Sequence, residues 1–321
     1  MKLGSGQFVF EEVEGWAKPP LECKLGEVPG IAVDSQDRVY AFCRAENPVV
    51  IFDRDGNYLN SWGKGLFTRP HMIFIAPDDS VYCVDDQGHR IKKFTPNGEL
   101  LMTLQPQDGV PDTGYVPPDH LDVLRSGPPF NTPTDVALSP QGEIYVSDGY
   151  GNSRVHKFTN NGDLLLSWGE PGSQPSEFNL PHGVYVDPEG QVYIADRANC
   201  RIQIFSDQGT FISQWKEVWW PNSLCQDNER NFYVAEIGGI FMAGEKARLD
   251  KPGARMTIRS PEGEILSEWS EEDPYGEGRF FSPHSVALDS RGDIYVGQVT
   301  FSYTKGQAPP NAKVLTKYVR Q

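Results

Sequence analysis

The segment from Pro181 to Trp215 reads PHGVYVDPEGQVYIADRANCRIQIFSDQGTFISQW. Apolar and polar residues alternate along four short runs, and turns that contain glycine or aspartate separate these runs. Alternation with a period of two is typical of strands that bury one face. The segment therefore predicts a four-stranded antiparallel meander.

The same pattern recurs along the whole chain of 321 residues. Each copy has an opening proline, at Pro29, Pro70, Pro133, Pro181, Pro221 and Pro283, and a second-strand tyrosine, at Tyr40, Tyr82, Tyr145, Tyr193, Tyr233 and Tyr295. Because a single twisted sheet cannot bury both of its faces, such units stack around a common axis. We predict an all-β fold, a single six-bladed β-propeller over residues 1–321. We expect the segment from Gln7 to Val13 to close the last blade, and we expect no helix.

Two insertions interrupt the repeat, at residues 105–132 and 238–253. Both are rich in proline and glycine and are too long for hairpin turns. Connections of this length are often active-site lids or binding loops. Whether these two act as lids does not follow from the sequence.

The composition excludes several classes of partner. The chain has 29 basic and 44 acidic residues and a net charge of −15, which repels a nucleic-acid backbone. It contains neither an apolar signal core nor a run of about 18 apolar residues, so we expect a cytoplasmic protein without a membrane partner. The five cysteines lack CxxC spacing, and we expect free thiols. The oligomeric state is open, and a monomer is compatible with the sequence.

Histidines follow the opening proline in alternate copies of the repeat, at His71, His182 and His284. Alternate blades of a six-bladed ring are a third of a turn apart, so the three imidazoles should converge on the axis. Three nitrogen ligands with room for water or substrate suit a catalytic zinc ion. For one histidine alone, an imidazole bonded to backbone or water would be the simpler interpretation. The other histidines fit no register, and we expect ordinary loop or surface residues at His89, His120 and His156.

The loop after each second strand should lie on the same face as the three histidines. Arg44 and Arg197 occupy equivalent positions in this loop, four residues after the blade tyrosine, and two guanidinium groups suit a carboxylate ligand. An ion pair between blades is the alternative for them. Tyr150 is the one tyrosine that stands five residues after a blade tyrosine, and a phenol near a cation could act as a base. A packing role is the alternative for Tyr150.

Other repeated side chains indicate structural roles. Arginines recur just before the third strand beside aspartates of the second strand, as Arg90 with Asp85, Arg154 with Asp148, and Arg201 with Asp196. Repetition in several blades favours bracing of the fold. Tryptophans end the outer strands and should pack there, at Trp62, Trp168, Trp215 and Trp269.

The chain resembles NHL-repeat propellers and, more narrowly, the peptidyl-α-hydroxyglycine α-amidating lyase (peptidylamidoglycolate lyase) family. The shared motifs are Pro-His in alternate blades, Asp-Gly-Tyr-x-Asn-Ser-Arg at residues 148–154, and Ala-Asp-Arg-x-Asn at residues 195–199. This resemblance implies zinc on the three histidines and reaction roles for Tyr150, Arg44 and Arg197. It also implies that a peptide ending in α-hydroxyglycine is split into an amide and glyoxylate.

The chain departs from that family at two positions. Gly151 stands where the family has a cysteine, so the family's disulfide is not expected. Ser285 stands where the family has an aspartate that helps to hold a structural calcium ion, and calcium binds oxygen ligands, preferably charged ones. We therefore expect no calcium at this place.

Together these features predict a zinc-dependent carbon–nitrogen lyase. Its substrate would be a small molecule or a peptide with a terminal carboxylate, with an α-hydroxyglycine-type compound first among the candidates. One alternative is a metal-dependent hydrolase or hydratase that acts on another small substrate. The other is a propeller without enzymatic activity that binds a protein partner.

Overall fold

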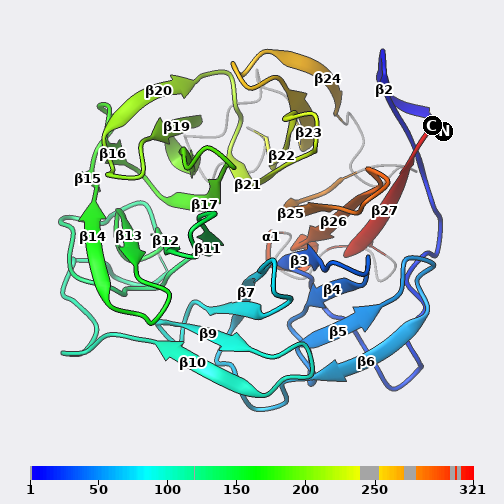
Figure 1. Ribbon diagram of the computed structural model, residues 1–321, viewed down its shortest axis with the longest axis horizontal. Coiled ribbons are helices and arrows are strands. Elements are labelled where there is room, and N and C mark those ends of the chain that lie inside the picture. Colours follow the sequence, from blue (N-terminus) through cyan, green and yellow to red (C-terminus); the bar gives the residue numbers. More distant parts are fainter. Residues whose placement is uncertain (1, 119, 239–252, 271–279, 304–307, 309–311) are drawn as a thin grey trace. The chain divides into compact units, whose positions relative to one another are not determined.

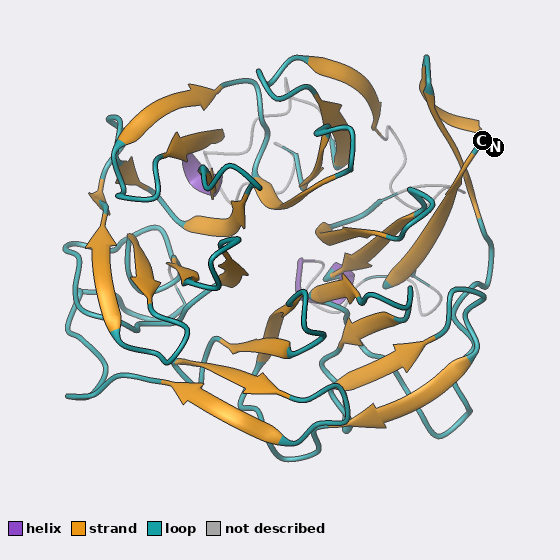
Figure 2. Ribbon diagram, viewed as in Figure 1, coloured by secondary structure: helices purple, strands orange, loops and turns teal. Residues whose placement is uncertain are grey.

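The computed structural model describes the whole chain except residues 1, 119, 239–252, 271–279, 304–307 and 309–311. Nearly all of the regular structure is β-strand (Figure 2). The chain divides into two compact units, a middle unit of residues 67–221 and a terminal unit of residues 1–66 and 222–321. The insertion at residues 238–253 lies almost entirely outside the described residues.

The middle unit holds blades two, three and four, each an antiparallel four-stranded sheet whose strands follow chain order (Figure 1). Blade two consists of β7 (Pro70–Ile75), β8 (Val81–Asp85), β9 (Arg90–Phe94) and β10 (Leu100–Leu104). Blade three consists of β11 (Asp135–Leu138), β12 (Ile144–Asp148), β13 (Arg154–Phe158) and β14 (Leu164–Trp168). The short parallel pair β15 (Glu170–Pro171) and β16 (Glu177–Phe178) follows. Blade four consists of β17 (Pro181–Val186), β18 (Val192–Asp196), β19 (Arg201–Phe205) and β20 (Phe211–Trp215), with the 3₁₀ turn η1 (Arg197–Asn199) between β18 and β19.

The terminal unit holds blades one, five and six. Blade one consists of β3 (Gly30–Val33), β4 (Val39–Phe42), β5 (Val49–Phe52) and β6 (Tyr58–Trp62). Blade five consists of β21 (Pro221–Gln226), β22 (Phe232–Glu236), β23 (Arg255–Arg259) and β24 (Ile265–Ser270). Blade six consists of β25 (Pro283–Leu288), β26 (Ile294–Gln298), β27 (Leu315–Arg320), β2 (Phe8–Glu12) and an extra strand β1 (Lys2–Ser5).

These six sheets are the six-bladed β-propeller that the repeat predicts. Strand β2 pairs antiparallel with β27, so the expected closure of the last blade by the N-terminal segment is confirmed. The expectation of no helix is wrong, because α1 (Thr300–Tyr303) and η1 each form one short turn. No helix among the described residues is long and apolar enough to cross a membrane.

A turn aspartate and the blade tyrosine explain why the repeat folds as it does. The Oδ1 atom of Asp187 accepts hydrogen bonds from the backbone N–H of Glu189 and Gln191, which closes the turn between the first two strands. Its Oδ2 atom accepts a hydrogen bond from the hydroxyl of Tyr193 at 3.3 Å. Equivalent bonds join Tyr233 to Asp227 and Tyr295 to Asp289. The tyrosine thus buries its ring while its hydroxyl keeps a partner.

Apolar side chains of adjacent blades share each core. In the middle unit, one cluster joins Val84 of blade two to Val146 of blade three, and another joins Tyr145 of blade three to Phe205 of blade four. Phe130 of the first insertion is 1% exposed and belongs to the former cluster. Trp168, Trp215 and Trp269 are buried and Trp62 is partly buried, which agrees with the packing role expected for them. All five cysteines are free thiols, as expected.

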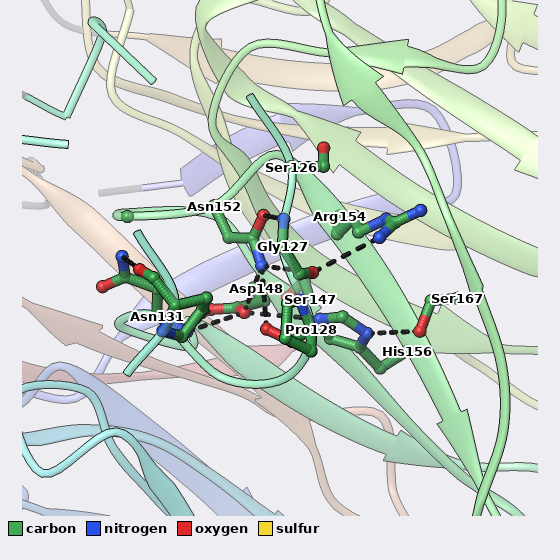
Figure 3. A network of polar contacts seen from close by, with 12 residues as sticks. Ser126, Gly127, Pro128, Asn131, Ser147, Asp148, Asn152, Arg154, His156 and Ser167 are labelled. Carbon is green, nitrogen blue, oxygen red and sulfur yellow. Dashed lines mark hydrogen bonds and ion pairs between the residues drawn. The ribbon is translucent and has the colours of Figure 1, made fainter. Parts of the chain in front are cut away.

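Two of the three expected arginine braces are present. Arg90 and Arg201 pair with Asp85 and Asp196 at 2.9 Å and 2.7 Å. Arg154 does not pair with Asp148, but it pairs with the exposed Glu170 at 3.4 Å and donates to the carbonyl of Gly127 in the first insertion. The carboxylate of Asp148 is occupied by Asn131, Asn152 and His156, as Figure 3 shows.

Arg201 should be the costliest of these arginines to remove. It is 7% exposed, and besides Asp196 it donates to the carbonyls of Ser173, Gln174 and Glu177. Arg201→Ala would leave the buried Asp196 carboxylate without its cation, which typically costs about 3–5 kcal/mol. We expect that loss in the free energy of unfolding measured by urea denaturation.

Arg154→Ala is the matched control for this measurement. Its partner Glu170 is 62% exposed, and exposed ion pairs contribute about 0–1 kcal/mol. Equal losses in the two variants would contradict the assignment of Arg201 as a buried brace.

Candidate functional site

A local irregularity accompanies each of the three Pro-His pairs. The pairing of β7 with β8 shifts register between Pro70 and Ile73, and that of β17 with β18 shifts between Pro181 and Gly183. In the terminal unit, β25 and β26 shift between Pro283 and Ser285. Strands β3 and β11, which have no such histidine, pair with their neighbours without a shift. An extra residue of this kind redirects a side chain, and here the residue at the shift is a histidine.

The imidazoles of His71 and His284 are held in the same way. His71 is fully buried, and its Nδ1 donates to the carbonyl of Thr134 at 2.6 Å. In the terminal unit, His284 is 1% exposed, and its Nδ1 donates to the carbonyl of Pro29 at 2.7 Å. Because a carbonyl can only accept, both bonds place the hydrogen on Nδ1 and leave a lone pair on Nε2. This is the tautomer that a metal-ligating histidine adopts when a second group fixes its ring.

His71 and His182 lie in the middle unit with their ring centres 5.0 Å apart, and His284 lies in the terminal unit. Three buried imidazole nitrogens are a donor set that suits zinc and other borderline transition metals better than it suits calcium or magnesium.

Tyr150 joins two of these histidines within the middle unit. Its hydroxyl oxygen lies 3.0 Å from Nε2 of His71 and 3.1 Å from Nε2 of His182. Both imidazoles meet the phenol ring edge to face. The phenol has one hydrogen, so it can donate to only one of the two imidazoles. A proton-exchanging group is thus centred on the nitrogens that would ligate a metal.

Two glycines allow Tyr150 to reach this position. A Cβ atom at Gly149 would lie 2.0 Å from the carbonyl oxygen of Pro181, and one at Gly151 would lie 2.5 Å from Oδ1 of Asn131. The chain therefore passes too close to blade four and to the first insertion for any side chain at these positions. This explains the Asp-Gly-Tyr-Gly sequence after β12.

Arg197 lies beside the phenol. Its side chain is 2% exposed, and Nη1 lies 3.5 Å from the Tyr150 oxygen. Its guanidinium stacks on the ring of Trp220 at 5.2 Å. Burial lowers the pKa of Arg197, and the nearby Tyr150 oxygen opposes part of that fall.

Arg44 has a different environment in the terminal unit. Its Nη1 pairs with Oε2 of Glu27 at 2.5 Å and donates to the hydroxyl of Ser302 at 2.7 Å. Arg44 therefore makes an ion pair, the kind of contact that was the alternative for this position. Equivalent places in the repeat thus carry arginines with different neighbours.

Three side chains that contact this site were not identified from the sequence. The guanidinium of Arg69 lies 6.0 Å from the centre of the Tyr150 ring and 3.3 Å from Asp86. The indole ring of Trp220 stacks against the guanidinium of Arg197. Both residues immediately precede an opening proline, at a position that varies from blade to blade and lies two residues before the histidine position. Variation at that position was the signal that could have revealed them.

The third is His120, which lies in a loop as expected but contacts Tyr150. Its ring lies 4.2 Å from the ring of Tyr150. The expectation of a loop or surface position is wrong for His156, which is fully buried in β13 between Asp148 and Ser167. His89 is a loop residue, as expected, and its Nδ1 accepts the N–H of Thr132.

Comparisons with known proteins agree with this architecture. A model of the NHL repeat matches residues 130–158 and 178–205. NHL repeat-containing protein 3 of Mus musculus is 33% identical over 95% of this chain and 82% of its own length. The chain belongs to the NHL-repeat family. Among solved structures, the streptogramin B lyase structure covers 98% of this NHL-repeat protein with a TM-score of 0.59 at 11% identity, which shows a shared fold.

Amidating enzymes are also among its relatives. The NHL-repeat protein is 31% identical to peptidyl-α-hydroxyglycine α-amidating lyase 1 of Drosophila melanogaster, over 88% of this chain and 57% of that protein. It is 26% identical to peptidylglycine α-amidating monooxygenase of Rattus norvegicus, over 91% of this chain and 31% of that protein. The NHL-repeat protein thus spans about a third of the rat relative and little more than half of the fly relative.

Asp135 should give the NHL-repeat protein a distinctive pH dependence. Burial raises the pKa of its carboxyl from 3.8 to about 7, although the residue keeps some accessible surface and accepts the N–H of Val184. The folded protein holds this proton more tightly than the unfolded chain does. The stability that Asp135 contributes is therefore present below pH 4 and is lost as the pH rises to about 7.

Asp135→Asn should remove this dependence, because its amide oxygen can still accept the same N–H. We expect the melting temperature of the variant, relative to that of the unmodified protein, to rise between pH 4 and 7 and to stay level above pH 7. Thermal scans of metal-free protein across this range provide the measurement. A constant difference at every pH would show that Asp135 has an ordinary pKa.

Proposed function

We propose that this NHL-repeat protein is a zinc-dependent carbon–nitrogen lyase that cleaves α-hydroxyglycine-type substrates to an amide and glyoxylate. The observation that carries the proposal is the position of the Tyr150 hydroxyl, within 3.1 Å of two histidine Nε2 atoms and 3.5 Å from the Arg197 guanidinium. The motifs at residues 148–154 and 195–199 and the similarity to the fly lyase support it.

The metal would be held by His71, His182 and His284. Hydrogen bonds from Nδ1 orient two of these rings and raise their basicity as ligands. When bound, zinc supplies Lewis-acid polarisation of a substrate oxygen. Calcium has no part in the proposal, because the hydroxyl of Ser285 accepts the N–H of Ile31 at 3.0 Å in place of a charged ligand.

Arg197 would bind the substrate carboxylate. A guanidinium stacked on an indole loses little freedom when it binds, and it can form two parallel hydrogen bonds to a carboxylate. Arg44 is the second candidate for this role, and Glu27 already offsets its charge. We therefore assign the larger share of carboxylate binding to Arg197.

Tyr150 would transfer the proton. As phenolate, it takes the hydrogen of the substrate hydroxyl while the carbonyl of glyoxylate forms and the bond from carbon to the amide nitrogen breaks. The electron pair of that bond goes to nitrogen, which then receives the proton from Tyr150. No atom is gained or lost, and the phenolate is restored.

The other proposed properties follow from charge and from the site. The partner would be a small molecule or a peptide carboxylate, and nucleic acid is unsuited to a chain of charge −15. A hydrolase or hydratase would use the same metal on another substrate. A propeller that only binds a protein would have no use for a metal.

The metal is tested first. His182→Ala should reduce bound zinc from about one ion per chain to almost none, because two imidazoles hold zinc far more weakly than three. Atomic absorption after dialysis measures this. His89→Ala, which removes a loop histidine, is the control and should keep its zinc. Unchanged zinc in His182→Ala would rule out the histidine site and with it the lyase proposal.

The separate roles of Tyr150 and Arg197 are tested with peptidyl-α-hydroxyglycine as substrate. Tyr150→Phe should keep its zinc and fold and lose roughly 10²-fold to 10⁴-fold in kcat, the range for general acid–base catalysis. Arg197→Ala should instead raise KM by roughly 10-fold to 100-fold, because a charge-assisted hydrogen bond contributes about 1.5–3 kcal/mol.

Arg154→Ala serves as the control for both variants, since its guanidinium lies away from the phenol and pairs with Glu170. Both kinetic constants should stay near their unmodified values in it. Turnover at the unmodified rate by Tyr150→Phe would remove the phenol from the mechanism.

A further inference from the structure

The first insertion, residues 105–132, is attached to the loop that carries Tyr150. The hydroxyl of Thr113 donates to the carbonyl of Gly151 at 2.5 Å, and the N–H of Gly151 donates to the carbonyl of Asn131. Asn152 bonds Gly127 twice, through its amide oxygen and its amide nitrogen. The insertion is thus bonded to the two residues that follow Tyr150, and Figure 3 shows the part of this network around Asn152 and Asp148.

One aromatic stack of the insertion reaches the phenol itself. The ring of His120 lies 4.2 Å from that of Tyr150 at an interplanar angle of 33°. Tyr115 stacks in turn on His120 at 5.5 Å and 21°. The hydroxyl of Tyr115 lies 3.0 Å from Nδ1 of His120, so the two insertion residues hold each other.

The other ring contacts of Tyr150 show which motion of the phenol the His120 ring can restrict. His71 and His182 meet the ring at interplanar angles of 83° and 75°, so they contact it edge to face. Of the ring contacts to Tyr150 in the described part of the chain, that of His120 is the closest and the nearest to parallel. A stacked neighbour limits rotation of the ring out of its plane, which the two hydrogen-bonding contacts at the hydroxyl do not.

We propose that His120 is a positioning residue that holds the Tyr150 ring so that its hydroxyl stays between the nitrogens of His71 and His182. Tyr115 steadies His120 in this role. The insertion then acts as a fixed part of the site, carried there by its bonds to residues 151 and 152. This inference rests on the proposed function for its kinetic consequence, but the ring position itself can be measured without substrate.

Fluorine NMR of metal-free protein labelled with fluorotyrosine tests the ring position. The Tyr150 signal is the one that is missing in Tyr150→Phe. In His120→Ala this signal should move toward the position of free fluorotyrosine, because the stacked ring is lost. In His120→Phe, which keeps an aromatic ring without its nitrogens, it should stay near its original position.

Ser126→Ala is the control for general loosening of the insertion. Its hydroxyl donates to the carbonyl of Gly169, and no bond or ring contact to Tyr150 is described for it. We expect this variant to lower the melting temperature without moving the Tyr150 signal. An unmoved signal in His120→Ala would overturn the proposal, and so would a His120→Phe signal that matches His120→Ala.

If the protein turns over peptidyl-α-hydroxyglycine, the kcat and KM of the His120 variants provide a second test. His120→Ala should lower kcat by roughly 10-fold to 100-fold, the scale of a misplacement of about 1 Å, and leave KM nearly unchanged. His120→Phe should recover most of kcat. A rise in KM with constant kcat would overturn the assignment. Absence of turnover in the unmodified protein would refute the proposed function and leave the NMR result on His120 standing.

Discussion

The register shift behind each Pro-His pair is the constraint on which the candidate site depends. In a regular pairing, successive side chains alternate between the two faces of a blade. An extra residue breaks this alternation and redirects one side chain, and at β7, β17 and β25 that side chain is an imidazole. A backbone carbonyl then holds Nδ1 of His71 and of His284, so the same strand geometry that redirects the ring also selects its tautomer.

Periodic features of the sequence were sufficient to predict the fold and much of the site. The opening prolines and blade tyrosines repeat because every blade needs the same turn and the same buried phenol, as the bond between Tyr193 and Asp187 illustrates. The histidines stand out because they occupy only alternate copies. Tyr150 stands out because no other blade has a tyrosine five residues after its blade tyrosine. Each of these signals compares one position across equivalent blades, and such a comparison needs no knowledge of long-range contacts.

The failures come from contacts that the repeat does not determine. His120 lies in an insertion without a counterpart in other blades, so its approach to Tyr150 depends on bonds such as that from Thr113 to Gly151. Arg154 differs from Arg90 and Arg201 in its partner for a related reason. Asn131 of the insertion and His156 of β13 already occupy the Asp148 carboxylate, and the arginine turns outward to Glu170.

Arg44 and Arg197 show that equivalent positions in the repeat need not have equivalent neighbours. Both follow the blade tyrosine by four residues, yet Arg44 faces a carboxylate while Arg197 faces a phenol and an indole. An arginine that already has a carboxylate partner gains less from a second one, because the first has offset its charge. Burial lowers the pKa of Arg197, and the nearby Tyr150 oxygen opposes part of that fall. In a chain of net charge −15, binding of an anion must depend on such local cations, and Arg197 is a buried one that contacts the Tyr150 hydroxyl and the Trp220 ring.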